Sequence, residues 1–485
     1  MARWLLTIAV FGTSFFGTPF GTQFADGAEN QLSTHYGETA KRLIDAATTD
    51  PHSLDRLEFL CDRIGNRLSG STSLDRAVAW AFEEMKHAGM ENVRAQSVKV
   101  PHWVRGEESA VAISPMERNL PILGLGNSVG TAPGGITANV VVVSTFDELM
   151  ALGSAKVRGN IVLFDAPYQG YGRTVAYRVS GASRAGALGA VAVLVRSITP
   201  ISLRTPHTGT LVYLSDSPQI PAAAVTLEDA EWMHRVTARG STVRVRLKMA
   251  AHFEPEASSA NVIGEIPGSE RPEEVVVMGG HIDSWDVGQG AQDDGSGIMV
   301  SLEAAALIKK MGLKPRRTLR VVFWVNEENG GAGGRTYRTA LGEDVKNHVA
   351  AIEMDGGAEK PLGFGYGEGE HVRPGLGAPA PPTTISEPPV SRAVEVLREI
   401  GSLLTPIGAN HIERGGGGSD IEPLMEAGVP GIGEISSGAH YFDWHHTEAD
   451  TFDKVNPQDF RESVASMAVM GYVLADMPER LSDLK

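Results

Sequence analysis

Six ionisable residues in the second half of the chain have the types that a pair of divalent cations requires. They are His281, Asp293, Glu327, Glu328, Asp355 and His446. Imidazole and carboxylate groups are ligands that suit zinc. In a two-metal site one carboxylate bridges the two ions, and the bound water becomes acidic enough to act as a nucleophile near neutral pH. The set therefore predicts a hydrolytic site built on two metal ions.

Three apolar runs, typical of buried parallel strands, lead into these residues. EVVVMGG precedes His281, TLRVVFWVN precedes Glu327, and HVAAIEMD ends in Asp355. The carboxyl ends of parallel strands form the edge of an open sheet where binding sites lie, so residues far apart in sequence are expected to meet there. Asp293 lies in the glycine-flanked loop GAQDDGSG before an expected helix, and His446 lies in a late loop.

The chemistry suggests a role for each residue type. A bridging carboxylate, for which Asp293 is the candidate, would hold two cations about 3.5–4 Å apart. Each cation would then take one imidazole, from His281 or His446, and one further carboxylate. Glu327, beside a ligand, would accept the proton of the metal-bound water and pass it to a leaving amine. Asp283 could accept the second ring N–H of His281 and fix the tautomer of that imidazole.

Spacing alone leaves two of these positions open. Asp294 is adjacent to Asp293, and either could be the bridge while the other caps the helix that follows. His445 is adjacent to His446, with His440 nearby. A Glu-Glu pair is ordinarily a solvated helix face, but this pair ends a very apolar strand and meets glycines, which favours catalysis.

Alternation of strands and helices predicts an α/β fold with a mostly parallel (mixed) sheet covered by helices on both faces. We expect a main domain made of residues 29–120 and 256–485. Residues 121–255 have a different texture, with short β-rich runs between Gly, Pro and Ser turns, which predicts an inserted α+β module. The expected helices lie at 38–47, 53–63, after an N-cap at Ser73, and at 177–187, 227–238, 296–311, 391–403 and 459–475.

Several longer strings carry a resemblance to a known family. They are LCDRIGNRLSGS, PHTG from Pro206, IPAAAVTLEDAE, GGHIDSWDVGQGAQDDGSG and HHTEADT. From about Gly37 to the C-terminus the chain resembles the co-catalytic zinc exopeptidases of the aminopeptidase and glutamate carboxypeptidase group. The resemblance implies two Zn²⁺ ions per chain, a peptide substrate and a homodimer. It also implies that the inserted module is a protease-associated domain.

The family pattern also implies a role for each site residue. It makes Asp293 the bridging ligand, Glu327 the general base and His446, directly before Thr447, the last ligand. The remaining ligands fall on His281, Glu328 and Asp355.

The composition and the N-terminal residues indicate which partners and which cellular location to expect. Lys and Arg total 43 against 59 Asp and Glu, a net charge of −16, which argues against nucleic acid or an anionic membrane as partner. The one cysteine, Cys61, excludes an intrachain disulfide and is expected to fill an apolar helix face. Arg3 followed by the apolar run 4–16 predicts a signal peptide, residues 1–28, and a secreted or periplasmic protein with no membrane contact after cleavage.

The function predicted is zinc-dependent hydrolysis of dipeptides or short peptides with free termini. Tyr441, or a backbone N–H in the loop 415–420, could stabilise the oxyanion. Arg335, Glu413 and Arg414 are candidates for contacting a substrate terminus. The alternatives are an aminopeptidase on longer peptides, a one-metal acyltransferase of the glutaminyl-cyclase type and a non-catalytic scaffold of the same fold. The complete ligand set argues against the last two.

Overall fold

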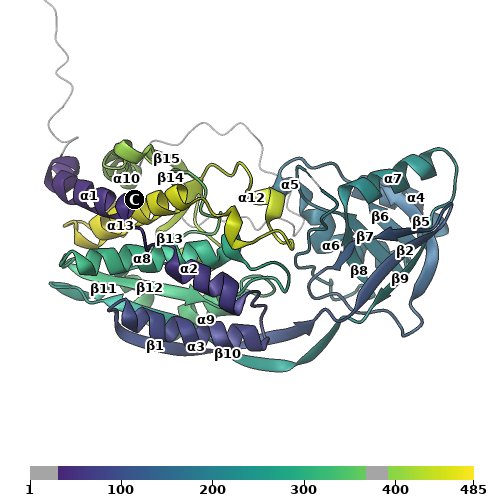
Figure 1. Ribbon diagram of the computed structural model, residues 1–485, viewed down its shortest axis with the longest axis horizontal. Helices are drawn as coiled ribbons and strands as arrows, with labels where there is room; N and C mark the ends of the chain where they lie inside the picture. The colour runs from purple at the N-terminus through teal and green to yellow at the C-terminus, as the bar shows by residue number, and fades with distance from the viewer. Residues whose placement is uncertain (1–30, 202, 368–390, 485) are drawn as a thin grey trace, which may run out of the picture.

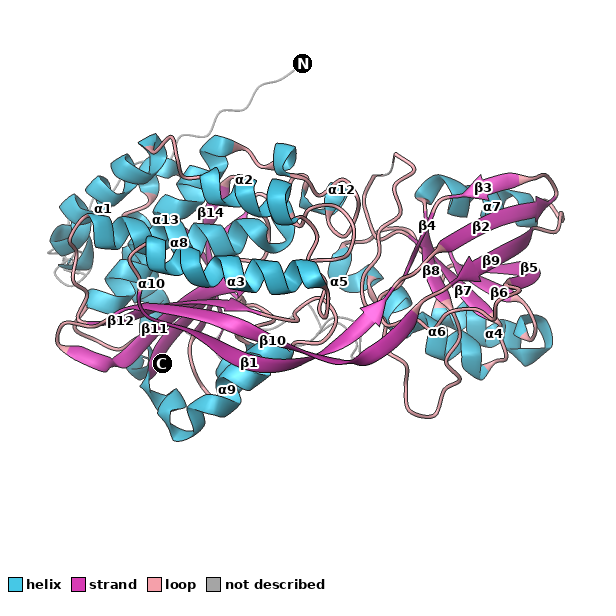
Figure 2. Cartoon of the chain, turned by 60° about the horizontal axis from the view of Figure 1, so that its bottom comes forward, coloured by secondary structure: helices cyan, strands magenta, loops and turns pink. Residues whose placement is uncertain are grey.

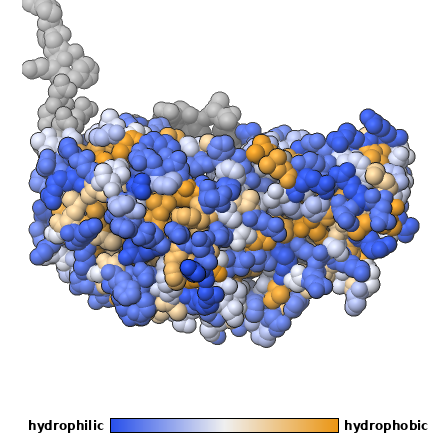
Figure 3. Space-filling view, in the orientation of Figure 1, coloured by the Kyte–Doolittle hydropathy of each residue, from blue (hydrophilic) through white to orange (hydrophobic). Residues whose placement is uncertain are grey.

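The computed structural model describes residues 31–201, 203–367 and 391–484, and the expected signal peptide lies outside them. The described chain forms two lobes side by side (Figure 1). The large lobe consists of the described residues up to 104 and from 252 onwards, and the second lobe consists of those in 105–251. Each lobe is built on an eight-stranded sheet, as far as the described residues go. Both lobes are mostly hydrophilic on the face shown in Figure 3, with smaller apolar areas scattered over it.

The sheet of the large lobe is parallel at its centre. In spatial order its strands are β1 (Glu91–Val104), β10 (His252–Ile266), β12 (Arg317–Trp324), β11 (Arg271–His281), β13 (His348–Glu353), β16 (Gly431–Ser436), β14 (Pro361–Gly367) and β15 (His411–Arg414). β11 pairs in parallel with β12 and β13, and β13 pairs in parallel with β16. β10 and β14 join this centre in antiparallel orientation. The expected α/β fold with a mixed sheet is confirmed.

Helices cover both faces of this sheet (Figure 2). The main hydrophobic core lies on one face, under α1 (Gln31–Thr49), α2 (Asp55–Phe59), α3 (Thr72–His87), α8 (Ser296–Lys310), α10 (Arg392–Ser402) and α13 (Pro457–Asp476). A smaller core lies on the other face, under α9 (Ala332–Leu341) and α11 (Glu422–Glu426). The central strands are therefore buried on both sides, which is why their sequences are continuous apolar runs.

Two details of the N-terminal helices differ from expectation. The N-cap of α3 is Ser71 rather than Ser73, because Ser71 is extended and its Oγ accepts the Leu74 N–H at 3.1 Å. The helix expected at 53–63 is α2 followed by a π-helical turn, Leu60–Ile64. Cys61 lies in that turn and is buried in the core, where burial raises the pKa of its thiol to about 12.

The second lobe repeats the plan of a sheet between helices. Its strands, in spatial order, are β3 (Arg118–Leu120), β2 (Glu108–Ser114), β9 (Arg244–Met249), β5 (Ile136–Val143), β6 (Ile161–Phe164), β7 (Ala192–Arg196), β8 (Ala222–Val225) and β4 (Ile122–Gly124). α7 (Leu227–Ala238) packs on one face, and α4 (Phe146–Val157) and α6 (Ala176–Ala187) pack on the other. β2 and β3 precede residue 121, so this sheet includes strands that the expected division placed in the main domain.

Helices α6 and α7 lie where they were expected, but α4 was not expected. Thr145 Oγ1 accepts the Glu148 N–H at 3.1 Å, and Glu148 Oε2 accepts the Ser144 N–H at 2.7 Å. This reciprocal pattern resembles a capping box and was a readable signal for the start of the helix.

The long strands β1 and β10 join the two lobes as an antiparallel ribbon (Figure 2). Their pairing extends to Val104 opposite His252, where the chain enters and leaves the second lobe. Among the described helices, none is long and apolar enough to cross a membrane.

Candidate metal centre

The carboxyl edge of the large sheet brings the predicted residues together. His281 is the last residue of β11, and Asp355 lies two residues after β13. After β12, Asn326 takes a left-handed conformation (φ 70°) and turns the chain into Glu327 and Glu328. The expected convergence at strand ends is therefore seen in the structure.

Two loops supply the remaining candidates. Asp293 lies in a tight turn, Ala291–Gly295, directly before α8. His446 lies two residues after the short helix α12 (Tyr441–Trp444), in a left-handed conformation with φ 62°.

Asp293 lies between two groups of side chains. On one side, His281 Nε2 is 3.3 Å from Asp293 Oδ1 and 3.3 Å from Asp355 Oδ1. On the other side, His446 Nε2 is 3.2 Å from Asp293 Oδ2 and 3.2 Å from Glu328 Oε2. Each oxygen of one carboxylate thus faces a different imidazole–carboxylate pair, which is the arrangement that a bridging ligand between two cations requires.

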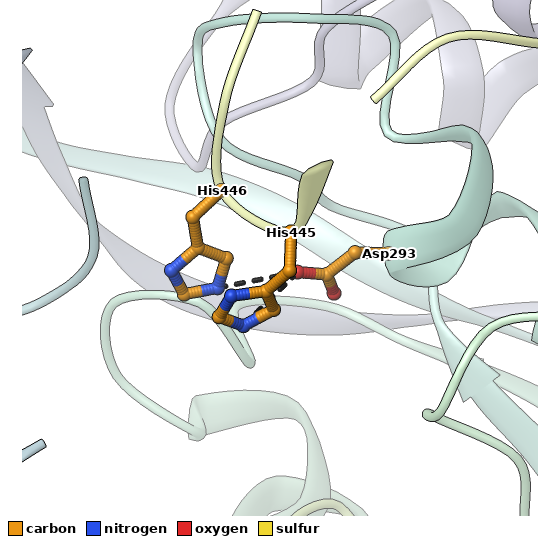
Figure 4. Close-up of side chains that lie close together, drawn as sticks. All are labelled: Asp293, His445 and His446. Carbon is orange, nitrogen blue, oxygen red and sulfur yellow. Dashed lines mark ion pairs between the residues drawn. The ribbon is translucent and has the colours of Figure 1, made fainter. Parts of the chain in front are cut away.

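The two residues left open by spacing differ in their contacts. His445 also approaches Asp293, but its Nε2 is 3.8 Å from Asp293 Oδ2, and its ring stacks on that of His446 at 3.5 Å (Figure 4). Asp294 accepts the N–H of His281 and the N–H of Gly297, each at 3.0 Å. Its carboxylate therefore ties the end of β11 to the first turn of α8, as expected for a capping residue.

Asp283 supports the site through different atoms from those expected. The His281 Nδ1 atom is 3.0 Å from the backbone carbonyl of Asp283 and 3.9 Å from its carboxylate. The carboxylate instead accepts the backbone N–H groups of Glu327 at 3.1 Å and Glu328 at 3.4 Å. The carbonyl is therefore the acceptor that fixes the tautomer of His281, while the carboxylate holds the Glu-Glu turn.

Two further buried residues position the ligands and were not predicted from the sequence. Asp450 accepts the backbone N–H groups of Gln292 at 2.8 Å and Asp293 at 3.2 Å. The fully buried Arg67 donates to the carbonyl of Ile282 at 2.7 Å and to that of Gly290 at 3.0 Å. Both residues lie inside strings that carry the family resemblance, HHTEADT and LCDRIGNRLSGS, and that placement was the available signal.

The site gathers several buried carboxylates, whose negative charges a cation would balance. Burial raises the pKa of the Glu328 carboxyl to about 8, with the Asp293 charge adding to it, and burial raises the pKa of Asp355 to about 6. For Asp293, hydrogen bonds from His281 and His446 outweigh burial and hold its pKa well below the usual range. Glu328 Oε1 is buried and accepts no hydrogen bond from the described residues. The donor set therefore fits dications, which would stabilise the ionised carboxylates.

One side of the cluster is more open than the other. The side chains of His281 and Glu328 are 0% and 2% exposed, whereas that of Asp355 is 24% exposed. Glu327 is half-buried. A substrate would therefore reach the cluster from the side of Glu327 and Asp355.

The residues that were expected to contact substrate lie on several separate elements. Tyr441 is buried and its ring packs 5.1 Å from that of His445, so it remains a candidate oxyanion donor. In the loop 415–420, the Asp420 N–H already binds the buried Glu353 carboxylate at 3.0 Å. Arg335 lies in α9, and Glu413 and Arg414 lie on the edge strand β15.

Fold and donor set together define a metal-dependent hydrolase, and the comparisons with known proteins agree. The pattern of Peptidase family M28 matches residues 261–470. Carboxypeptidase Q from Bos taurus is 41% identical over 450 residues, covering 92% of this chain and 91% of the relative. The human carboxypeptidase Q is 41% identical over 448 residues, covering 92% and 90%.

Solved structures give the same result. A peptidase M28 precursor from Shewanella amazonensis SB2B matches with a TM-score of 0.85 and 31% identity, over 92% of this chain and 98% of that one. A zinc aminopeptidase from Bacillus subtilis shares the fold, with a TM-score of 0.64 and 20% identity, over 89% and 97%. The chain belongs to peptidase family M28 and is a metallo-exopeptidase.

Proposed function

We propose that this exopeptidase binds two Zn²⁺ ions and hydrolyses dipeptides or short peptides with free termini. The observation that carries the proposal is the position of Asp293, whose two carboxylate oxygens face His281 on one side and His446 on the other. In this proposal both ions would share Asp293. His281 and Asp355 would hold one ion, and His446 and Glu328 would hold the other.

Residues of the chain would carry out proton transfer and stabilise the oxyanion. The ions, when bound, supply an acidic water and polarise the scissile carbonyl. Glu327, on the open side, takes a proton from the attacking water and returns it to the leaving amine. Asp283 keeps Glu327 in place through the backbone N–H of that residue. Tyr441 is the proposed donor to the oxyanion.

The experiment that tests the substrate class compares one dipeptide in three forms: free, N-acetylated and C-amidated, each with and without a metal chelator. We expect loss of cleavage with either blocking group, since the proposal requires both termini to be free. Loss with acetylation alone would favour an aminopeptidase on longer peptides, and loss with amidation alone a carboxypeptidase. Cleavage of both the N-acetylated and the C-amidated form would contradict the proposal.

Three further expectations remain predictions. They are export through the signal peptide 1–28, assembly as a homodimer, and the division into a catalytic domain in two parts and an inserted domain, which was expected at 121–255 and which we propose is the second lobe, residues 105–251. The second lobe supports an inserted protease-associated domain, because the chain enters and leaves it at paired positions of β1 and β10.

A further inference from the structure

The PHTG string has no role in the function proposed above, yet it contacts a candidate metal ligand. Thr208, in the second lobe, and His446, in the large lobe, contact each other twice. The Thr208 N–H donates to the His446 carbonyl at 3.0 Å, and the His446 Nδ1 atom is 3.3 Å from the Thr208 carbonyl. Because His446 Nε2 faces Asp293 and Glu328, a metal-binding His446 carries its hydrogen on Nδ1, and the Thr208 carbonyl accepts it.

A buried arginine of the second lobe holds the same carbonyl. Arg178, on α6, is 6% exposed and donates from Nη1 to the Thr208 carbonyl at 3.3 Å. The same Nη1 is 3.4 Å from His446 Nδ1, so both nitrogens converge on one acceptor. Nη2 donates to the Tyr171 hydroxyl at 2.8 Å. Arg178 therefore links helix α6 and the short helix α5 (Tyr171–Thr174) to the carbonyl that positions His446.

The glycine of the PHTG string is required by this contact. Gly209 has φ 133°, a conformation that favours glycine, and a Cβ there would lie 2.2 Å from Arg178 Nη1. A side chain at Gly209 would therefore push the guanidinium away from Thr208.

Other contacts keep the second lobe against the site. Arg105 forms a two-bond ion pair with Asp286, which lies in the loop after β11, at 2.5 and 2.8 Å. Trp285 in that loop has its ring 5.5 Å from that of His446, and a Cβ at Gly126 of the second lobe would lie 2.0 Å from the Trp285 ring. Figure 1 shows α5 beside α12, the helix that leads to His446.

We propose that the second lobe contributes to the metal centre by orienting one of its ligands. The Thr208 carbonyl, held by Arg178, fixes the tautomer and orientation of His446. Docking of this lobe then sets the affinity for the ion that His446 and Glu328 hold, while the ion at His281 and Asp355 depends on the large lobe alone. The inference rests on the two-metal function proposed above and assigns Arg178 as a positioning residue.

The test is the zinc content of Arg178→Met during titration with a chelator. Methionine keeps most of the side-chain volume but removes every donor. We expect the wild type to hold two ions per chain, and the variant to hold one ion normally and the other about 10–100-fold more weakly. kcat should fall with the loss of that ion, with little change in KM, and excess zinc should restore it.

A matched control lies on the same helix. Arg184 on α6 is exposed and stacks over Phe146, so Arg184→Met makes the same substitution away from His446 and should hold both ions as the wild type does. Wild-type affinity for both ions in Arg178→Met, or equal weakening of both, would overturn the inference. If Arg178→Met does not fold, Gly209→Ala decides, because its added Cβ would push the guanidinium away from Thr208, and wild-type affinity for both ions in that variant overturns the inference. A wild-type enzyme that binds no zinc would instead refute the proposed function.

Discussion

The two lobes have similar sheets, but buried carboxylates of the second lobe have different neighbours from the carboxylates of the candidate metal centre. In the second lobe, Asp165 directly follows the parallel strand β6, much as Asp355 follows β13 in the large lobe. Asp165 is 5% exposed, and it pairs with Arg196 at 3.0 Å and His234 at 2.6 Å. Asp229, fully buried in the same lobe, pairs with Arg118 at 2.5 Å and with Arg204 at 3.2 Å.

The carboxylates of the candidate metal centre share imidazoles with one another, in place of the arginines that pair with Asp165 and Asp229. Glu328 faces His446 and Asp293, and burial raises its pKa to about 8. A carboxylate at the end of a parallel strand is therefore not by itself a sign of a metal site. What distinguishes the site is that its carboxylates converge on one another and on imidazoles, so that their charge is left for a cation to balance.

The largest contrast between the lobes is expected from removing one carboxylate from each. Asp293→Ala should lose bound zinc and fall to the activity of the metal-free protein, because both proposed ions share this ligand. Asp165→Ala should keep both ions, because its carboxylate serves only Arg196 and His234. Elemental analysis of the purified variants measures this, and two ions per chain in Asp293→Ala would refute the bridge.

A smaller and purely kinetic effect is expected at Glu327. Glu327→Gln should keep both ions and lose about 100- to 10,000-fold in kcat, because the amide cannot accept the proton of the water. Glu231→Gln in the second lobe, where Glu231 is half exposed and pairs with Arg196, is the matched control and should leave kcat unchanged. Steady-state kinetics with metal analysis checks this, and unchanged turnover in Glu327→Gln would remove the base assignment.

The smallest effect on the chemistry is expected at Asp229. Asp229→Asn weakens the pairs with Arg118 and Arg204 and should lower the free energy of unfolding by about 1–3 kcal/mol, a modest value because both arginines are partly exposed. Zinc content and kcat should not change. Urea denaturation followed by circular dichroism measures the loss of stability. A fall in zinc content would contradict the prediction, because it would show that Asp229 also affects the metal centre.

Sequence was sufficient for the centre of the large sheet and for the residues at its carboxyl edge. The apolar runs before His281, Glu327 and Asp355 are buried on both faces, so their strand character was clear, and the strands end within two residues of the expected positions. The strands β14 and β15 were not predicted. β14 has glycine at alternate positions and β15 is four residues long, so neither has a clear apolar pattern.

The contacts that orient the two imidazoles could not be predicted, because their acceptors are backbone carbonyls. The carbonyls of Asp283 and Thr208 serve the two imidazoles, and any residue type offers a carbonyl. Spacing could not separate His445 from His446 either, since both rings approach Asp293 and differ by 0.6 Å in their distances of 3.8 and 3.2 Å. Which ring meets Glu328 depends on the left-handed backbone at His446, a feature without a sequence signature.

The ribbon of β1 and β10 has a consequence for the order in which the chain folds. The second lobe is one continuous segment, and its sheet is complete between Glu108 and Met249. In the large lobe, β1 pairs with β10, which is synthesised only after that segment. Contacts that close short loops form fastest, and domains tend to fold during synthesis as they emerge. We therefore expect the second lobe to fold while the large lobe is still incomplete, so that Thr208 is already in place when the segment that contains His446 folds.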